Sequence, residues 1–304
     1  MDVTGPKIKK YQNQFVAGPD KKIKLSKFST NGTGHKLLRG KSDSEVKQLL
    51  KKQLEADRQA LSSAQELLAS SHEYAILIIL QGMDTSGKDG TIRHVMAGIN
   101  PQGCSVNSFK VPSPEEHRHD FLWRYSKALP VRGMIGIFNR SYYEDVLVVR
   151  VHPDRMEELP EKIGNTNKRF WDGRYQDITT FEHHLVRNGT IVLKFFLHIS
   201  KNEQRRRLID RLNNQKKYWK FSFSDIAERD YWDQYQAVYE EMLSKTSTGY
   251  APWFIVPADN KEIARTFVAD AVTEAIQGLN LTYPTFSDEQ IQHFMNAKKA
   301  LEKE

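Results

Sequence analysis

The feature that most constrains the fold is an apolar run followed by a glycine-rich loop that ends in lysine. Residues 76–80 are all apolar, and Gly82, Gly87 and Lys88 then complete the Walker A-like pattern G-x4-G-K. Backbone N–H groups of such a loop surround phosphate oxygens, and the lysine neutralises their charge. A helix that begins after the loop adds its positive N-terminal dipole. The sequence therefore predicts a P-loop protein, with a strand before the loop and a helix after it.

Two carboxylates make this loop unusual. Asp89 follows Lys88, at the position where a serine or threonine commonly ligates magnesium, and Asp84 lies inside the loop. A negative side chain there repels phosphate unless a metal ion lies between them, so the loop indicates metal-bridged phosphoryl chemistry. The loop residues assigned to phosphate binding besides Lys88 are Gly82, Thr85, Ser86, Gly87 and Asp89.

Composition narrows the class of protein. A chain of 304 residues with 39% hydrophobic residues can form one large α/β domain or two small ones. The net charge of +7 favours an anionic partner, although a generally basic surface explains it equally well. The single cysteine, Cys104, excludes an internal disulfide and a cysteine-based zinc site. The N-terminus lacks the apolar core of a secretory signal, and no apolar run approaches membrane-spanning length, so we expect a cytoplasmic protein.

Strand and helix patterns alternate along the chain. Apolar or alternating runs predict strands at 74–80, 105–111, 133–138, 191–199 and 252–256. Helical patterns cover 44–70, 89–99, 114–129, 168–187, 201–212, 224–244 and 260–279. Such alternation is typical of βαβ units with helices on both faces of a parallel sheet. We therefore expect one α/β domain over 44–304, with a basic arm at 1–43 and a flap at about 200–224.

Ligands of open parallel sheets bind at the carboxyl ends of the strands. The third predicted strand is followed by Asn139 and Arg140, with Glu144 and Asp145 one helical turn later. Arg140 can stabilise charge that spreads over a transferred phosphoryl group, or it can form an ordinary ion pair. We interpret Asp145 as a carboxylate in the first turn of a helix.

Basic residues gather in two further places. The helix at 201–212 carries Lys201, Arg205, Arg206, Arg207 and Arg211. This helix is either a solvated charged face or a lid that closes over polyanionic substrates. A second group, which could line another anion path, consists of Arg93, Arg118, Arg124 and Lys127.

Aromatic residues and histidines in this part of the sequence allow two interpretations. Tyr218, Trp219, Phe221 and Phe223 lie among lysines and could stack on a nucleobase, or they could pin the flap to the core. We favour pinning, at least for Trp219. We interpret the pair His183-His184 as structural, because no third ligand pattern accompanies it.

Five blocks of the sequence, in collinear order over about residues 40–280, resemble the polyphosphate kinase 2 family. They read GMDTSGKDGTIRHVMAGINPQG, FNRSYYEDVLVVRVHP, LHISKNEQRRRL, KKYWKFS and APWFIVPADNKEIAR. The resemblance implies a P-loop kinase-like three-layer α/β/α fold with a central five-stranded parallel sheet and a lid. It implies magnesium-dependent, reversible phosphoryl transfer between inorganic polyphosphate and nucleotides, in homodimers or homotetramers. Mn²⁺ is the alternative metal, and guanine nucleotides join AMP, ADP and ATP as candidate substrates.

The resemblance also assigns roles to individual positions. Asp84 would bind metal, Lys88 would grip the transferred phosphoryl group, and Arg140 would bridge donor and acceptor phosphates. Arg207 and Arg211 fall where the family keeps lid arginines. The polyphosphate chain would thread a basic channel, for which the candidates are Arg93, Arg118, Arg124 and Lys127.

Two departures from the common family pattern resemble the subgroup called class III, which phosphorylates both nucleoside monophosphates and diphosphates. Many relatives have aspartate where this chain has Asn139, and asparagine where it has Glu144. Asparagine at 139 removes a charged metal ligand, and Glu144 restores a carboxylate nearby. We therefore expect Asp84 and Glu144 to be the metal ligands.

Two other functions compete with this assignment. An ordinary P-loop kinase would use ATP as the donor, but it would commonly carry serine or threonine at the position of Asp89. A nucleic-acid-binding module would use the net charge of +7. It would give no role to Asp84 and Asp89, so we expect neither nucleic acid nor a membrane as partner.

Overall fold

A computed structural model describes residues 12–19, 21–32, 38–156 and 166–304 of the chain. Its centre is one sheet of six strands in the order β1-β6-β5-β2-β4-β3. The strands are β1 (Val16–Ala17), β2 (Ala75–Gln81), β3 (Cys104–Ser108), β4 (Ile135–Asn139), β5 (Thr190–His198) and β6 (Trp253–Pro257). The five predicted parallel strands are confirmed, and β1 adds an antiparallel sixth at the edge of β6. β1 lies within the basic arm, and two residues are too few to produce a strand pattern in the sequence.

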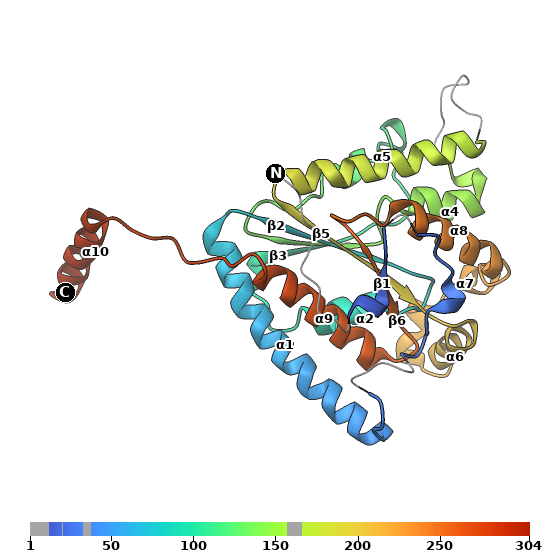
Figure 1. The fold of residues 1–304 in the computed structure, drawn as a ribbon, viewed down its shortest axis with the longest axis horizontal. Helices are drawn as coiled ribbons and strands as arrows, with labels where there is room; N and C mark the ends of the chain where they lie inside the picture. Colours follow the sequence, from blue (N-terminus) through green and yellow to red (C-terminus); the bar gives the residue numbers. More distant parts are fainter. Residues whose placement is uncertain (1–11, 20, 33–37, 157–165) are drawn as a thin grey trace.

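Helices cover both faces of the sheet, so the predicted three-layer architecture is confirmed. One layer contains α1 (Asp43–Ser71), α2 (Lys88–Val95) and α9 (Lys261–Gln277), and the other contains α4 (Glu144–Val151), α5 (Lys168–Arg187) and α8 (Trp232–Thr246) (Figure 1). The shorter helices α3 (Trp123–Ser126), α6 (Lys201–Leu212) and α7 (Ser224–Ala227) lie in connections, and α10 (Asp288–Leu301) follows the last layer. Among the described helices, none combines the length and the apolar character needed to cross a membrane.

The strand order places the P-loop at the centre of the molecule. β2 is buried along its whole length and lies between β4 and β5. The chain passes from β2 to β3 and β4 on one side and then crosses to β5 and β6 on the other. The connection after β2 therefore lies where the strand order reverses, which is the usual ligand site of such sheets.

Two predicted helices are interrupted. The pattern at 114–129 gives only a single 3-10 turn at 116–118 and the four-residue α3. A capping box forms at its start, because Ser113 N donates to Glu116 Oε2 and Glu116 N donates to Ser113 Oγ. Asp120 then accepts a hydrogen bond from Leu122 N, which competes with continuation of the helix.

The second interruption divides the pattern at 224–244 into α7 and α8. Glu228 lies between them, and its carboxylate accepts hydrogen bonds from His152 and Tyr235 and pairs with Arg155. These tertiary contacts hold the turn, and helical periodicity in the sequence does not reveal them. The helix α10 was not predicted either.

Candidate active site

The loop after β2 has a backbone shape that needs glycine at two positions. Gly82 has a φ of 151°, and a Cβ atom there would lie 2.8 Å from the carbonyl oxygen of Leu197 on β5. Gly87 has a φ of 108° and precedes the first turn of α2. Such left-handed backbone is strained for residues with side chains. The two glycines therefore let the loop curl against β5 and direct α2 away from it.

The side chains of the loop leave polar groups available at its centre. Thr85 has a φ of 62°, an uncommon value for a β-branched residue and one that functional loops tolerate. The buried hydroxyl oxygens of Thr85 and Ser86 have no hydrogen-bond partner within the described residues. Buried hydroxyl groups are normally satisfied, so unpaired ones mark a place where a ligand oxygen can bind. The loop thus has the groups expected of a phosphate site.

Lys88 is buried beneath the loop. Its Nζ donates to the carbonyl oxygen of Gly82 at 2.6 Å and to that of Met83 at 3.3 Å. Burial, helped by the positive charge of Arg140, lowers the pKa of Lys88 from 10.5 to about 8. The ammonium group is therefore desolvated and held at the base of the loop, where an anion would strengthen its positive form.

Arg140 forms the second part of the site, at the end of β4. Its Nη2 lies 2.8 Å from Asp84 Oδ1 in the P-loop, and its Nη1 lies 3.2 Å from Glu144 Oε2 on α4. Gln81, the last residue of β2, donates to the other oxygen of Glu144. Glu144 first, and Asp84 after it, raise the pKa of Arg140 above its already high value. Arg140, Asp84 and Glu144, which the sequence predicted as site residues, thus meet where β2 and β4 end, and Gln81 joins them.

The backbone at Arg140 is also in the left-handed region, with a φ of 66°. Its amide donates to the carbonyl oxygen of Leu80, and the segment that follows is anchored in the core. The hydroxyl groups of Tyr142 and Tyr143 both donate to Glu182 on α5, at 2.9 and 2.7 Å. Glu182 also pairs with the fully buried Lys194 at 2.6 Å. This buried network fixes where the guanidinium group points.

Asn139 and Asp89 form a direct pair across the site. Asn139 Nδ2 donates to Asp89 Oδ1 at 2.8 Å, and Asn139 itself is buried. An aspartate at 139 would place two carboxylates in contact, an arrangement that requires a metal ion or a proton between them. Asparagine removes that requirement, so the carboxylates left to face Arg140 are Asp84 and Glu144.

The geometry of these two carboxylates fits a magnesium ion. Both already converge on one cationic group, and carboxylate oxygens are the protein ligands that Mg²⁺ prefers. Within the described part of the chain, no group of three or more His, Cys, Asp or Glu side chains is arranged to hold a metal ion. Magnesium in phosphoryl-transfer sites is commonly bound by one or two carboxylates together with substrate phosphates, so two are sufficient.

The helix α6 is fastened to the P-loop by Arg207 rather than standing free of it. Arg207 is buried, and its guanidinium donates to the carbonyl oxygens of Thr85 and Ser86 at 3.0 and 2.9 Å and also to that of Ala258. Gln204 donates to the carbonyl oxygen of Asp84. In this structure Arg207 therefore positions the P-loop by binding its backbone carbonyl groups. Sequence spacing did not indicate this role.

Arg211 lies one turn further along α6 and faces the flap. It pairs with Asp225 of α7 at 3.2 Å and donates to the carbonyl oxygen of Lys220. Burial, together with the negative charge of Asp84, raises the pKa of Asp225. Asp225 therefore lies near Asp84 of the P-loop, and Arg211 connects the end of α6 to α7 and to Lys220. No feature of the sequence singled out Asp225.

The predicted second anion path is divided between two places. Arg124 is largely buried, donates to the carbonyl oxygen of Lys110, and packs over the rings of Phe109 and Tyr125. Lys127 lies 4.2 Å from the Trp123 ring centroid, and Arg118 is exposed on the same connection. Arg93 is instead on α2, where its charge acts on Arg265 of α9. These four residues therefore do not form one path in the structure.

The structure reveals another basic cluster, next to the P-loop helix. A methyl group at Gly90 would lie 3.8 Å from Arg265 Nη2, so this guanidinium covers the first turn of α2. Burial lowers the pKa of Lys261, and the charges of Arg207, Arg206 and Arg265 lower it further, which shows that these cations are close together. Lys261 and Arg265 follow the carboxyl end of β6, and no local pattern of the sequence singled them out.

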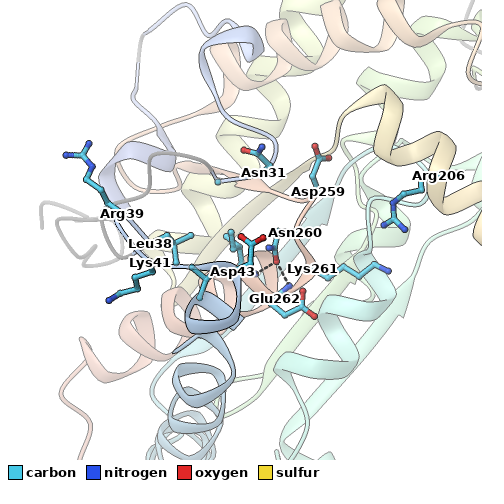
Figure 2. Close-up of a pocket in the computed structure, with 13 residues that line it drawn as sticks. Asn31, Leu38, Arg39, Lys41, Asp43, Arg206, Asp259, Asn260, Lys261 and Glu262 are labelled. Atoms are coloured by element: carbon cyan, nitrogen blue, oxygen red, sulfur yellow. Dashed lines mark hydrogen bonds between the residues drawn. The ribbon is translucent and has the colours of Figure 1, made fainter. Parts of the chain in front are cut away.

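A cavity of about 740 Å³ opens beside this cluster (Figure 2). Figure 2 shows Lys261 and Arg206 on one side of it and Arg39 and Lys41 on the other. Asp43, Asp259 and Glu262 also line it, so its charge is mixed. Arg206 pairs with Glu203 and Asp210 on its own helix, so Lys261 is the residue that makes this end of the cavity suited to an anion.

Trp219 and Phe223 of the flap are exposed, which makes the interpretation of Trp219 as a pin to the core wrong. Its exposed fraction is 78%, and that of Phe223 is 85%. His183 packs against the ring of Tyr250, in agreement with its interpretation as structural.

Comparison with known proteins identifies relatives over almost the whole chain. The family described as "Polyphosphate kinase 2 (PPK2)" matches residues 43–283. An ADP-polyphosphate phosphotransferase of Rhodopseudomonas palustris is 46% identical, over 95% of this chain and 97% of the relative. An AMP/ADP-polyphosphate phosphotransferase of Meiothermus ruber is 41% identical, over 91% and 96%. The crystal structure of polyphosphate kinase 2 from Arthrobacter aurescens superposes with a TM-score of 0.82 at 36% identity, over 97% of this chain and 99% of that one.

Proposed function

This chain belongs to the polyphosphate kinase 2 family, and we propose that it transfers phosphoryl groups from inorganic polyphosphate to both AMP and ADP. The observation that carries the proposal is the junction of β2 and β4, where a P-loop lysine and an arginine meet two carboxylates. The name of the Meiothermus ruber relative includes both acceptors, which supports the wider acceptor range. The enzyme is a phosphotransferase with a phosphate group as acceptor, and its reaction is reversible.

The chemistry requires two polyanions to be held in line. A terminal phosphate oxygen of the nucleotide attacks the end phosphorus of polyphosphate, and the bond from that phosphorus to the next bridging oxygen breaks. The acceptor phosphate is already ionised near neutral pH, so no strong general base is needed. Lys88 and the loop N–H groups would hold the transferred group, and Arg140 would lie between donor and acceptor. Positioning and charge neutralisation supply most of the catalysis in such transfers.

We propose Mg²⁺ as the metal, with Mn²⁺ as the alternative, held by Asp84 and Glu144. When bound, it supplies positive charge to the phosphates of both substrates. In the structure these carboxylates are paired with Arg140, at 2.8 and 3.2 Å. Arg140 would therefore leave at least one carboxylate when the metal binds, and its guanidinium would become available for the phosphates.

The distal part of the donor needs positive charge beyond the loop. Arg265 on α9 covers the first turn of α2 after Lys88, and Lys261 lies one turn earlier on α9, near the charge of Arg206 on α6. Arg118 and Lys127, which the sequence favoured, lie on the connection after β3. We assign the polyphosphate tail to the Lys261 cluster in place of Arg118 and Lys127, which the resemblance suggested for the polyphosphate channel.

The pKa of Lys88 makes the reaction sensitive to pH. Because its pKa in the free enzyme is about 8, Lys88 is charged below that pH and loses its charge as the pH rises through it. We expect kcat/KM for polyphosphate to fall between pH 7 and 9.5, and polyphosphate binding at pH 8.5 to take up protons. Calorimetry in two buffers of different ionisation enthalpy measures that uptake; a flat pH profile without proton uptake would contradict the expectation.

Glu144 should set the balance between acceptors, since the shifted carboxylate lets the acceptor phosphate sit at two depths. We expect Glu144→Asn to change the ratio of the rates with AMP and ADP by about tenfold, which corresponds to 1.4 kcal/mol. Initial rates with each acceptor at saturating polyphosphate measure it. Asp145→Asn, on the same helix turn, is the matched control. An unchanged ratio in the Glu144 variant removes this residue from the explanation.

A direct assay tests the function as a whole. Purified protein is supplied with AMP, polyphosphate and Mg²⁺ in the absence of any nucleoside triphosphate, and ADP and ATP are followed over time. Formation of ADP and then ATP is expected, and guanine nucleotides are tested in the same way. A kinase that uses ATP as its only donor would give no product, and a nucleic-acid-binding protein would give none either.

Three other expectations stay predictions from the sequence. They are assembly as a homodimer or homotetramer, a cytoplasmic location, and closure of the flap at about 200–224 over the substrates. The ties from Arg207 and Gln204 to the P-loop support a flap whose base is fixed and whose tip, around Trp219, is exposed.

A further inference from the structure

The last helix of the chain stands apart from the domain. An extended segment at 281–287 leads away from α9, and α10 follows it at a distance from the sheet and its two helical layers (Figure 1). No residue of α10 is buried. The helix nevertheless has a strong start, because Ser287 and Gln290 form a complete capping box. The sequence therefore specifies a helix whose packing partner is not the rest of its own domain in this structure.

One face of α10 is apolar. Ile291, Phe294 and Met295 follow the i, i+3, i+4 spacing of a single helix face, and their exposed fractions are 46, 54 and 53%. Phe286, which precedes the helix, packs edge-on against Phe294 with ring centroids 5.1 Å apart. A 14-residue helix is marginally stable alone in water and depends on burying its apolar face. This face therefore requires a matching apolar surface.

A groove of suitable character lies between α1 and α9. It has a volume of about 200 Å³, and it is lined by Ala60, Ser63, Ala64, Leu67, Ile276, Gln277, Asn280 and Leu281. The small residues of α1 permit close approach of another helix, and the partly exposed side chains of Leu67 and Leu281 supply the apolar contact. The extended segment leaves the body at this groove, because Leu281 is both part of its wall and packed on the core.

We propose that α10 of one copy of this chain docks in the α1–α9 groove of a second copy, and that the second copy does the same in return. The helix and the groove belong to the same chain, so one two-fold rotation satisfies both at once and closes the assembly. With Leu301, which is 69% exposed, the five apolar side chains of this segment expose on the order of 500 Å² per helix. Counting the matching groove surface and both exchanges, the interface buries on the order of 2,000 Å², enough for a stable dimer.

The proposal does not depend on the assignment of the active site. α9 begins at the carboxyl edge of the sheet, next to the P-loop, and it ends at the opposite edge, where the groove lies. Loss of docking should therefore leave kcat within about twofold of wild type, which is the size of effect expected of ordinary surface substitutions. Assembly and activity can thus fail separately.

Sedimentation equilibrium gives the first test. The double variant Phe294→Asp, Met295→Asp places two charges on the apolar face, and His293→Asp, Asn296→Asp places two on the polar face as the matched control. We expect the apolar-face variant to have half the mass of wild type or less, and the control to keep the wild-type mass. A monomeric wild type, or equal masses for all three proteins, would overturn the proposal.

Cross-linking identifies the partner surface. In a Cys104→Ser background, one preparation carries Ala60→Cys and the other carries Met295→Cys, and the two are mixed before a short bismaleimide is added. A product of twice the chain mass is expected only in the mixture. A control tests whether α10 docks in the groove of its own chain. A single chain that carries both Ala60→Cys and Met295→Cys is treated with the bismaleimide at low protein concentration. A cross-link confined within single chains would show that α10 occupies its own groove and would overturn the exchange.

Discussion

Replacing Lys88 with alanine should lower kcat/KM by a factor of about 10² to 10³, or roughly 3–4 kcal/mol of transition-state stabilisation. The P-loop holds the buried Lys88 beneath its carbonyl groups, with Nζ 2.6 Å from the oxygen of Gly82. A desolvated positive charge interacts with a transferred phosphoryl group far more strongly than an exposed one does. Initial rates with AMP and with ADP, at several polyphosphate concentrations, measure the loss.

The control for this variant is Lys245→Ala. Lys245 lies on α8 and pairs with Asp172 at the surface, so its loss should leave the rate unchanged. Thermal unfolding of both variants verifies that the loop remains folded. Near-normal turnover of Lys88→Ala in a folded protein would refute the assignment of the P-loop as the phosphate site.

Replacing Arg140 with alanine should have two effects of opposite sign. The rate should fall by about 10² to 10³, because the charge between donor and acceptor phosphates is removed. Binding of Mn²⁺ in the absence of substrates should tighten by about tenfold, because Asp84 and Glu144 lose the cation that now neutralises them. Electron paramagnetic resonance of free Mn²⁺ measures the second effect independently of turnover.

Arg132→Ala is the matched control, since Arg132 precedes β4 and Arg140 follows it, at opposite ends of the same strand. Neither rate nor metal affinity should change in that variant. If Arg140→Ala lost activity but bound Mn²⁺ no more tightly than wild type, Asp84 and Glu144 would not be the metal ligands. The arginine would then act on the phosphates alone.

Local sequence patterns predicted much of the fold because each reports on a short stretch of backbone. The five parallel strands and the helix at 168–187 follow directly from apolar periodicity and from glycine at turns. The capping residue Ser200 correctly marks the start of α6, where its hydroxyl accepts from Glu203 N. The interrupted helices were missed because the residues that divide them, Asp120 and Glu228, act through side-chain contacts.

The candidate site was predicted unevenly, and the reason is again physical. Lys88, Asp84 and Arg140 are recognisable because the P-loop and the strand end fix their surroundings within a few residues. Arg207 was recognised as important, but its burial against the loop carbonyls depends on α6, which is more than a hundred residues away in sequence. Lys261 and Arg265 were missed because their neighbours, Arg206 and α2, are also distant along the chain.

The sequence by itself determined the P-loop, the alternation of strands and helices, and the resemblance to one family, because those depend on residue type and spacing. Only the tertiary structure decided which side chains meet: Arg140 with Asp84 and Glu144, and Asn139 with Asp89. These pairs form because β4 lies directly beside β2, so the two strand ends open at the same edge. Strand order is set by long-range packing, and no local pattern encodes it.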